Sequence, residues 1–440
     1  MLSNTKGLLP RQGAWEVLQS VAAGAYADVA LDRAIKKYSL LGSDRSLLTE
    51  LAYGAIRNRY LLDCWIDYLG KKPAKKQPPL LRWLLHIGIY QIIRMKKIPV
   101  SAAINTSVEI AKTGNLKNLA PVVNGLLRAV NRAYIAEIDL PLPESFQARI
   151  RQEYSLPNWL VAELISWFGE SQAEIISRAF NNVPSFDLRV NRIRETPFEL
   201  QKQLAEVGIE SSLMPDFPDG LSVEKGLRDL NQWPGYTEGK WCVQDRSSQW
   251  VAPLLEPQPG ERILDACAAP GSKTTHLAEL IGNDGEIWAV DRSLSRLKLV
   301  TENATRLGTD CINVLEADSL KLLNIRPDWE GYFHRILIDA PCSGLGTLSR
   351  NPDARWRLTP MKIRELTLLQ EKLLKSIVPL LKPGGRMVYS TCSIHPEENS
   401  RQIERFLSTC SDMSLKKEKQ ILPDTTRQGD GFYAAILELN

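Results

Sequence analysis

The sequence predicts a multidomain protein in which an all-α bundle, a small α+β connector and a doubly wound α/β domain follow one another. Two changes in the hydrophobic pattern predict this order. Apolar residues recur at helical spacing up to about residue 135, and short strand-like runs alternate with helical segments from about residue 240. The proline-containing stretch at residues 141–144 marks the first boundary. The predicted domains are therefore residues 1–140, 141–240 and 241–440.

The first domain is predicted to be a single helical bundle. Apolar residues recur at helical spacing in residues 14–30, 45–56, 61–69, 80–95, 100–111 and 120–130. The part from Leu81 to Ile93 is apolar nearly all round, which predicts the central buried helix of the bundle. His86 lies inside it and is predicted to be a hydrogen-bonded core residue and not a metal ligand.

The other two domains are predicted to contain sheets. In the connector, helices are expected at residues 157–168, 171–180 and 197–207, with a strand at 186–191. In the last domain, strands are expected at residues 262–266, 286–290, 312–316, 335–338 and 386–390. Helical segments between these strands imply a parallel sheet. Residues 431–438 have no helix after them and are predicted to add an antiparallel strand.

The basic charge is concentrated in the first domain. Residues 1–140 contain 20 Lys and Arg against 10 Asp and Glu, whereas residues 141–440 contain 35 against 41. The excess includes a lysine cluster in residues 71–76 and the basic residues Arg94, Lys96 and Lys97. A charge run can be an ordinary solvated face, but an excess over a whole domain is typical of a polyanion binder. The sequence therefore predicts that this domain binds RNA.

The cysteines and the apolar runs of the sequence indicate in which cellular compartment the protein is expected. The seven cysteines are Cys64, Cys242, Cys267, Cys311, Cys342, Cys392 and Cys410. Their odd number and the lack of a C-x-x-C pair argue against a disulfide framework or a zinc site, so no metal is expected. No run of about 18 apolar residues and no signal-like N-terminus occurs, which predicts a chain that neither spans a membrane nor is exported. A monomer in the reducing cytoplasm is expected.

Two cysteines directly follow predicted parallel strands. Cys342 lies in Asp339-Ala340-Pro341-Cys342-Ser343-Gly344, and Cys392 lies in Thr391-Cys392-Ser393. The carboxyl ends of such strands meet at one edge of the sheet, where active sites of open α/β folds are found, so both should face one crevice. Helix amides near such turns lower the pKa of a cysteine. The alternative is that both are small, inert core residues.

The loop after the first predicted strand of the α/β domain contains mainly small residues. It comprises Cys267, Ala268, Ala269, Pro270, Gly271, Ser272 and Lys273. Small residues allow a ligand to approach the backbone at a helix N-terminus. A P-loop would need glycines at positions 267 and 272, and no G-x-G-x-x-G is present, so neither a polyphosphate nor a dinucleotide is expected.

Two aspartates extend the expected ligand site along the sheet edge. Asp291 ends the second strand, 20 residues after Gly271, where an acidic residue binds a ribose diol in nucleoside-binding sheets. Asp318 closes the third strand and could meet an adenine amino group. Each aspartate alone could be a helix cap. Together with the small-residue loop they indicate an adenosine-containing ligand without a polyphosphate, and S-adenosylmethionine is the obvious candidate.

These motifs, together and in this order, give the chain its resemblance to a known family. It resembles the RNA (cytosine-5) methyltransferases of the Nol1/Nop2/Sun type over nearly its whole length. The resemblance implies a NusB-like helical RNA-binding domain, a connector and a class I methyltransferase domain. It implies that the loop from Cys267 to Lys273, with Asp291, Asp318 and Asp339, holds S-adenosylmethionine. The family loop usually has a second glycine where this chain has Ser272.

The resemblance also implies the catalytic roles. Cys392 would be the nucleophile that adds to carbon 6 of cytosine, which makes carbon 5 able to accept a methyl group and gives 5-methylcytosine. Asp339 would bind the Watson–Crick edge of the base, and Cys342 would assist the final elimination. Lys273 would help to position the base or the cofactor. The alternative for Lys273 is a solvated lysine in the first turn of a helix.

The implied substrate is small-subunit (16S) ribosomal RNA, protein-free or early in assembly. The target base must leave its stack, which favours single-stranded or loop RNA. Residues 350–357 combine cations with Trp356 and are expected either to clamp RNA or to form a plain surface loop. The alternatives are a transfer-RNA cytosine-5 methyltransferase, a DNA cytosine methyltransferase with Cys342 as nucleophile, and a catalytically silent NusB-like RNA-binding or assembly factor.

Overall fold

The computed structural model describes residues 7–113, 115–225, 229–425 and 429–440. The chain forms two compact units. The helical unit contains the residues up to Asn181 together with Arg350–Arg357, and the sheet unit contains Asn182–Ser349 and Leu358–Asn440. No helix among the described residues is long and apolar enough to cross a membrane.

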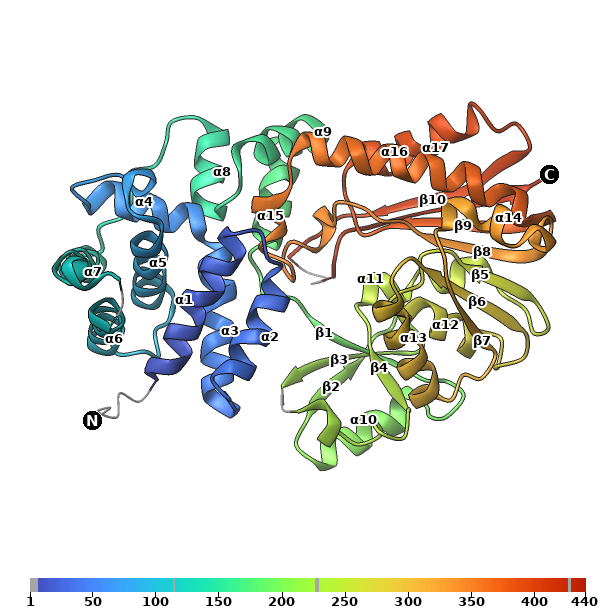
Figure 1. The fold of residues 1–440 in the computed structure, drawn as a ribbon, viewed down its shortest axis with the longest axis horizontal. Helices are drawn as coiled ribbons and strands as arrows, with labels where there is room; N and C mark the ends of the chain where they lie inside the picture. Colours follow the sequence, from blue (N-terminus) through green and yellow to red (C-terminus); the bar gives the residue numbers. More distant parts are fainter. Residues whose placement is uncertain (1–6, 114, 226–228, 426–428) are drawn as a thin grey trace. The chain divides into compact units, whose positions relative to one another are not determined.

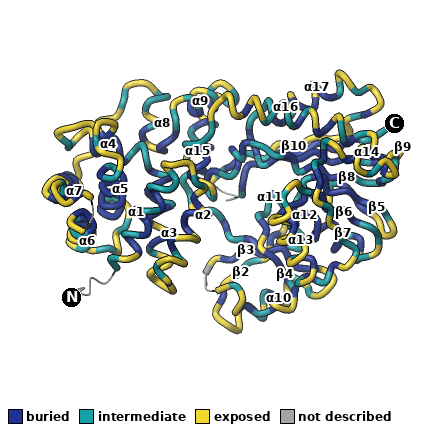
Figure 2. Tube along the Cα trace, viewed as in Figure 1, coloured by how far each residue is buried: buried dark blue, intermediate teal, exposed yellow. Residues whose placement is uncertain are grey.

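The helical unit is a bundle built around α5 (Figure 1). Its helices are α1 (Leu8–Ala22), α2 (Ala27–Lys37), α3 (Gly42–Arg57), α4 (Arg59–Leu69), α5 (Pro79–Arg94), α6 (Val100–Thr113), α7 (Ala120–Ile135), α8 (Phe146–Tyr154), α9 (Asn158–Ala179) and α15 (Ala354–Arg357). Figure 2 shows α5 in the dark blue of buried residues, which confirms it as the central helix. The single helix predicted over residues 14–30 is wrong. The chain turns at Gly24, which has a φ of 102°, and separates α1 from α2.

His86 is a core histidine, as predicted. It is fully buried in α5, and its Nε2 lies 2.9 Å from Oδ1 of Asp63 on α4. The same carboxylate pairs with Arg82. Burial lowers the pKa of His86, although the contact with Asp63 opposes this shift. The histidine therefore joins two helices of the core as a neutral ring.

Residues 350–357 form part of the helical unit and not a surface loop. Arg355 is fully buried, and its Nη1 donates to Oδ1 of Asn181 at 2.9 Å. Trp356 donates from Nε1 to the carbonyl oxygen of Ile56 at 2.7 Å. The expectation of an RNA clamp or a plain loop is therefore wrong for Arg355 and Trp356, because their polar groups bind backbone and amide groups inside this unit.

The sheet unit begins with the connector. Its elements are β1 (Phe186–Val190), α10 (Pro197–Glu206), β2 (Glu210–Leu213), β3 (Gly220–Lys225) and β4 (Trp241–Val243). The described strands pair antiparallel in the order β2-β3-β1-β4. Leu188 and Leu204 pack with Trp241 in a small core. The α+β fold of the predicted connector is confirmed. Its two predicted helices at residues 157–168 and 171–180 correspond to α9, which is kinked at Gly169 and belongs to the helical unit.

A larger sheet follows, with helices on both faces (Figure 1). Its elements are α11 (Arg246–Gln249), β5 (Arg262–Asp265), α12 (Ser272–Leu280), β6 (Glu286–Asp291), α13 (Leu294–Leu307), β7 (Ile312–Glu316), α14 (Leu322–Ile325), β8 (Phe333–Asp339), α16 (Pro360–Ile377), β9 (Leu381–Thr391), α17 (Ser400–Leu407), β10 (Met413–Ile421) and β11 (Phe432–Leu439). The described strands run in the order β10-β11-β9-β8-β5-β6-β7. β5 to β9 are parallel, and β11 pairs antiparallel with β9 and β10. The doubly wound sheet and the late antiparallel strand are confirmed.

Side chains of the central strands alternate between two cores. Ile336 and Ile338 of β8 pack in the core that contains Leu374 of α16, whereas Leu337 packs in the core that contains Leu277 of α12. The sheet is therefore buried on both faces, as a parallel sheet requires. The order of strands reverses direction between β5 and β8, and ligands of open α/β sheets bind at such a point.

Candidate active site

A cavity of about 260 Å³ opens at the carboxyl ends of the parallel strands. It is lined by Ala266, Cys267, Ala269, Asp291, Arg292, Arg296, Asp318, Ser319, Asp339, Ala340, Pro341, Cys342, Leu369, Leu373 and Cys392. The structure thus brings both predicted cysteines, the three predicted aspartates and part of the small-residue loop into one cavity. Arg292, Arg296 and Ser319 did not stand out in the sequence.

The backbone of the small-residue loop requires glycine at one position. Gly271 has a φ of 101°, and a Cβ atom there would lie 3.0 Å from Cα of Val300 in α13. Ser272 is the first residue of α12 and is only partly buried, so this position accommodates a side chain. The difference from the usual family loop therefore leaves the start of the helix intact. Ala268 and Ala269 are buried in the turn before it.

The connector holds the start of α12 through Arg189 of β1. This fully buried residue donates from Nη1 to the carbonyl oxygen of Ser272 at 2.6 Å and from Nη2 to Oε1 of Glu279 at 2.7 Å. Thr275 accepts another bond at 2.9 Å. An arginine inside the otherwise apolar end of a strand is the signal in the sequence that could have indicated a buried ion pair.

The two nucleoside-site aspartates both cap a turn and line the cavity. Oδ1 of Asp291 accepts from the backbone N–H of Ser293 at 3.0 Å, and Oδ1 of Asp318 accepts from that of Leu320 at 3.1 Å. The alternative that each aspartate is a cap is therefore correct, but it does not exclude ligand binding. Because each cap fixes its carboxylate at the cavity wall, capping and ligand binding are compatible.

Lys273 and Asp339 form a close pair next to the cysteines. Nζ of Lys273 donates to Oδ2 of Asp339 at 2.6 Å, and the hydroxyl of Ser390 donates to Oδ1 at 3.0 Å. Lys273 is buried, so the alternative of a solvated lysine is wrong. Burial by itself would lower the pKa of Lys273, but the carboxylate of Asp339 outweighs it and raises the pKa. The amine therefore stays charged in the site.

The two cysteines face each other with their Sγ atoms 3.4 Å apart. The hydrogen bond to Cys392 and, next, burial raise the pKa of Cys342 well above its usual value. The sequence-based expectation of a lowered pKa is therefore wrong for Cys342. The amide of Gly344 does favour the thiolate, but the hydrogen bond to Cys392 and burial outweigh it; the turn Leu345–Thr347 follows. Cys342 is held as a thiol that can donate to Cys392.

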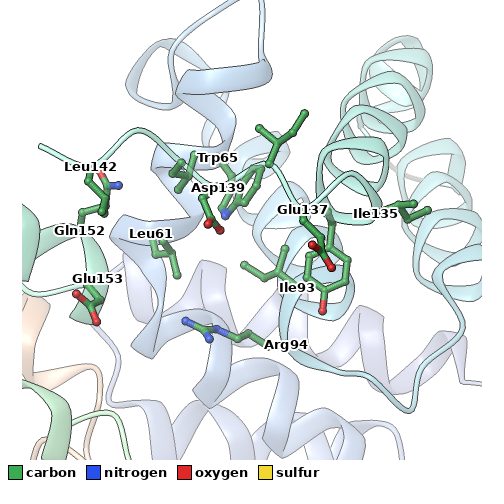
Figure 3. A pocket seen from close by; sticks show the side chains of 13 residues that line it. Leu61, Trp65, Ile93, Arg94, Ile135, Glu137, Asp139, Leu142, Gln152 and Glu153 are labelled. Atoms are coloured by element: carbon green, nitrogen blue, oxygen red, sulfur yellow. The ribbon is translucent and has the colours of Figure 1, made fainter.

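A second cavity, of about 720 Å³, lies in the helical unit (Figure 3). Leu61 and Ile93 contribute apolar surface, and Arg94 faces the same space as Glu137 and Asp139. Carboxylates outnumber cations around this cavity, which does not suit a phosphate. Among the described residues, no group of three or more His, Cys, Asp or Glu side chains is placed to hold a metal ion.

Comparisons with known proteins identify the family. The family described as 16S rRNA methyltransferase RsmB/F matches residues 252–438, the NusB family matches 9–132, and a ferredoxin-like domain of RsmF/B-like methyltransferases matches 156–228. The "Probable ribosomal RNA small subunit methyltransferase B" of Synechocystis sp. is 44% identical over 91% of this chain and 90% of that protein. The chain belongs to the ribosomal RNA small subunit methyltransferase B family.

A second curated relative and a solved structure match almost the whole chain. The "Ribosomal RNA small subunit methyltransferase B" of Proteus mirabilis is 36% identical over 96% of this chain and 98% of its own length. The crystal structure of PH0851 superimposes with a TM-score of 0.83 at 27% identity, and it covers 98% of each chain. Each matched family segment falls within one of the three predicted domains, whose boundaries remain predictions.

Proposed function

We propose that this protein transfers a methyl group from S-adenosylmethionine to carbon 5 of a cytosine in 16S ribosomal RNA. Family membership supports the methyl transfer and the RNA class. One observation supports the cytosine chemistry: Cys342 and Cys392 lie 3.4 Å apart beside the Lys273–Asp339 pair in one cavity. This arrangement suits covalent activation of a pyrimidine better than direct methylation of a nitrogen or oxygen.

The cavity fits the cofactor by the chemistry of its donors. Carboxylates such as Asp291 accept the two hydroxyls of a ribose, and Asp318 can accept from an adenine amino group. Cys267 and Ala269 of the small-residue loop line the same cavity, and Gly271 lets the loop pack closely against Val300 of α13. These residues, with Cys267 and the rest of the loop as far as Lys273, would hold S-adenosylmethionine. When bound, the cofactor supplies an electrophilic methyl group.

Cys392 is the proposed nucleophile. Carbon 5 of cytosine is a weak nucleophile while the ring is aromatic. Addition of a thiolate to carbon 6 breaks the aromaticity and gives carbon 5 enamine character, so that carbon 5 can accept a methyl group. Asp339 can accept a hydrogen bond from the exocyclic amine of cytosine, which uracil lacks. The charged Lys273 beside it offsets the negative charge that the ring gains.

Cys342 has a different proposed role. Its thiol lies within hydrogen-bonding distance of the sulfur of Cys392, and we assign the role of donor to Cys342. It would assist the last step, in which carbon 5 loses its proton, the ring double bond re-forms and the carbon 6–sulfur bond breaks to release Cys392. The raised pKa of Cys342 argues against the alternative in which Cys342 itself attacks the base, as in a DNA methyltransferase. A catalytically silent assembly factor would not need this pair.

A trapped intermediate tests the proposal. Cys342→Ala is expected to accumulate a denaturant-resistant adduct with protein-free 16S ribosomal RNA in the presence of S-adenosylmethionine, because elimination from Cys392 is slowed. Denaturing gels would detect it, and the double variant Cys342→Ala/Cys392→Ala is the control that should form none. If wild type and variants gave neither adduct nor methylation with this RNA, the proposal would be wrong. Adduct formation with transfer RNA alone would favour the transfer-RNA alternative.

The helical unit is the proposed RNA-binding part. Lys71, Lys72, Lys75 and Lys76 are all exposed between α4 and α5. Replacing these four by glutamine in the full chain should weaken RNA binding and reduce the slope of log K against log salt by about 3, since each phosphate contact adds about 0.7–0.9. Filter binding at several salt concentrations would measure this. Lys362→Gln/Lys375→Gln, at two lysines already paired with glutamates, is the control. An unchanged slope in the fourfold variant would contradict RNA binding by this surface.

The compartment and the assembly state are also proposals. The seven cysteines are free thiols, which suits the reducing cytoplasm where ribosomal RNA is modified. We propose that the protein acts there as a monomer on protein-free or partly assembled small-subunit RNA.

A further inference from the structure

The turns that carry the two cysteines rest on one buried carboxylate, Glu398. Ser343, next to Cys342, donates its backbone N–H to Oε1 of Glu398 at 2.8 Å and its hydroxyl to Oε2 at 2.5 Å. Ser393, next to Cys392, donates its hydroxyl to the same Oε2 at 2.6 Å. Glu398 is fully buried and does not line the cavity, and it bonds the residue that follows each cysteine.

The bonding around Glu398 is that of an ionised carboxylate. Gln370 of α16 donates its amide to Oε1 at 3.1 Å and also to the carbonyl oxygen of Pro341 at 2.9 Å. Each carboxylate oxygen therefore has two donors, and an ionised carboxylate accepts and does not donate. Burial raises the pKa of Glu398, while the donors from Ser343 and Ser393 oppose this shift. A charge in the interior is tolerated when it is bonded in this way.

Few other contacts join the two turns directly. The hydroxyls of Ser343 and Ser393 lie 3.0 Å apart, and the backbone N–H of Gly346 donates to the carbonyl oxygen of Cys392 at 3.0 Å. Glu398 binds both serines at once and so fixes each turn against the other. Without it, the 3.4 Å separation of Cys342 and Cys392 would depend on these two bonds and on strand pairing.

We propose that Glu398 is a positioning residue that sets the spacing and orientation of the two catalytic cysteines. This inference rests on the proposed function of the cysteine pair. A displacement of about 1 Å at a reacting atom can cost about 100-fold in rate, and residues that lock the reacting groups through hydrogen bonds prevent it. The contribution of Glu398 is therefore expected in the rate of covalent addition and not in cofactor binding.

Two substitutions of Glu398 separate its shape from its charge. Glu398→Gln keeps one carbonyl oxygen for the N–H donors of Ser343 and Gln370, but its amide group faces two serine hydroxyls that now donate to Oε2. Glu398→Ala removes all four bonds. The matched control is Glu397→Gln, because Glu397 precedes Glu398 in the same turn but pairs with Arg401 and Arg405 at the surface.

The experiment compares single-turnover methylation of 16S ribosomal RNA by the full-length variants. We expect Glu398→Gln to slow adduct formation by about 10- to 100-fold and Glu398→Ala to slow it further, with the affinity for S-adenosylmethionine changed less than about twofold. The pH profile of Glu398→Gln should keep both limbs, because Glu398 is not proposed to exchange protons. Removing its charge should lower the pKa of Cys342, because that charge adds to the hydrogen bond with Cys392 and to burial in raising it. Glu397→Gln should behave as wild type. Unchanged rates in both Glu398 variants would overturn the inference, and so would an equal loss of cofactor affinity or the loss of a limb of the pH profile.

A second measurement needs no RNA, so it distinguishes failure of the positioning role from failure of the proposed function. Phenylarsine oxide binds two neighbouring thiols by forming two As–S bonds, and its oxygen leaves as water with both thiol protons. Wild type should capture it through Cys342 and Cys392, Cys392→Ala should not, and Glu398→Ala should bind it at least about tenfold more weakly. If Glu398→Ala bound the arsenical as tightly as wild type does, the positioning role would be overturned. Inactive wild type that still captures the arsenical would contradict the proposed function alone.

Discussion

Replacing Cys392 by alanine is expected to abolish methyl transfer and to leave cofactor binding within about 1 kcal/mol of wild type. The thiol acts on the base, and it contributes only one small side chain to a cavity of about 260 Å³. Loss of a nucleophile removes the covalent route, so the rate should fall by at least about 10⁴-fold. Radiolabelled methyl transfer to 16S ribosomal RNA and calorimetry with S-adenosylmethionine would measure the two effects.

Cys410→Ala is the control for this substitution. Cys410 is another partly buried cysteine of the sheet unit, and it packs beside the core that contains Ile403 and Phe406 but does not line the cavity. This variant should keep full activity. A loss of cofactor affinity as large as the loss of activity in Cys392→Ala would contradict the assignment of Cys392 as the nucleophile. An adduct that forms in Cys392→Ala and requires Cys342 would reverse the two cysteine roles.

The largest effect on stability is expected from Glu279→Ala. The Arg189–Glu279 pair is almost completely buried, with side-chain exposures of 0% and 1%. Removing Glu279 leaves the guanidinium buried without its charged partner, which should cost about 3–5 kcal/mol of unfolding free energy. Because Arg189 also binds the carbonyl oxygen of Ser272, its displacement should weaken cofactor binding as well. Urea unfolding followed by tryptophan fluorescence, together with calorimetry, would measure both.

Two further variants show whether charge or packing is responsible. The double variant Arg189→Met/Glu279→Met removes both charges and should recover most of the stability, because a buried pair is often no better than an apolar one. It should not recover cofactor affinity, since Ser272 still lacks its donor. Asp32→Asn breaks the exposed Lys36–Asp32 pair and should change stability by less than about 0.5 kcal/mol. Equal losses of unfolding free energy in Asp32→Asn and Glu279→Ala would contradict this account of the buried pair.

The sequence was most informative where local pattern and function coincide. The apolar runs of the parallel strands are short and end in recognisable turns, so both cysteine turns and the loop at Gly271 could be placed at one sheet edge. The strand β10 was missed because its side chains are mostly exposed and lysine-rich, which is typical of an edge strand and resembles a loop in sequence. The break at Gly24 was missed because alanines on both sides continue an apolar pattern across it.

Partners that are distant in the sequence could not be predicted. Arg189 meets Glu279 across 90 residues, and Arg355 meets Asn181 across 174 residues. No local periodicity encodes such a pair. Glu398 lies close to Cys392 in the chain, but its link to Ser343 depends on the pairing of β8 with β9. The pKa of Cys342 likewise depends on a neighbour 50 residues away.

The route of the chain through residues 350–357 affects how the protein can be divided for experiments. The helical unit is encoded by two separate stretches of the gene, and the second lies between β8 and α16 of the sheet unit. A fragment that starts at residue 241 would therefore carry Arg355 and Trp356 without Asn181 and Ile56, the groups that bind them. Poor behaviour of such a fragment would reflect an exposed arginine and tryptophan and would say nothing about the methyltransferase sheet itself. Truncations should keep the helical unit, or replace this loop at the same time.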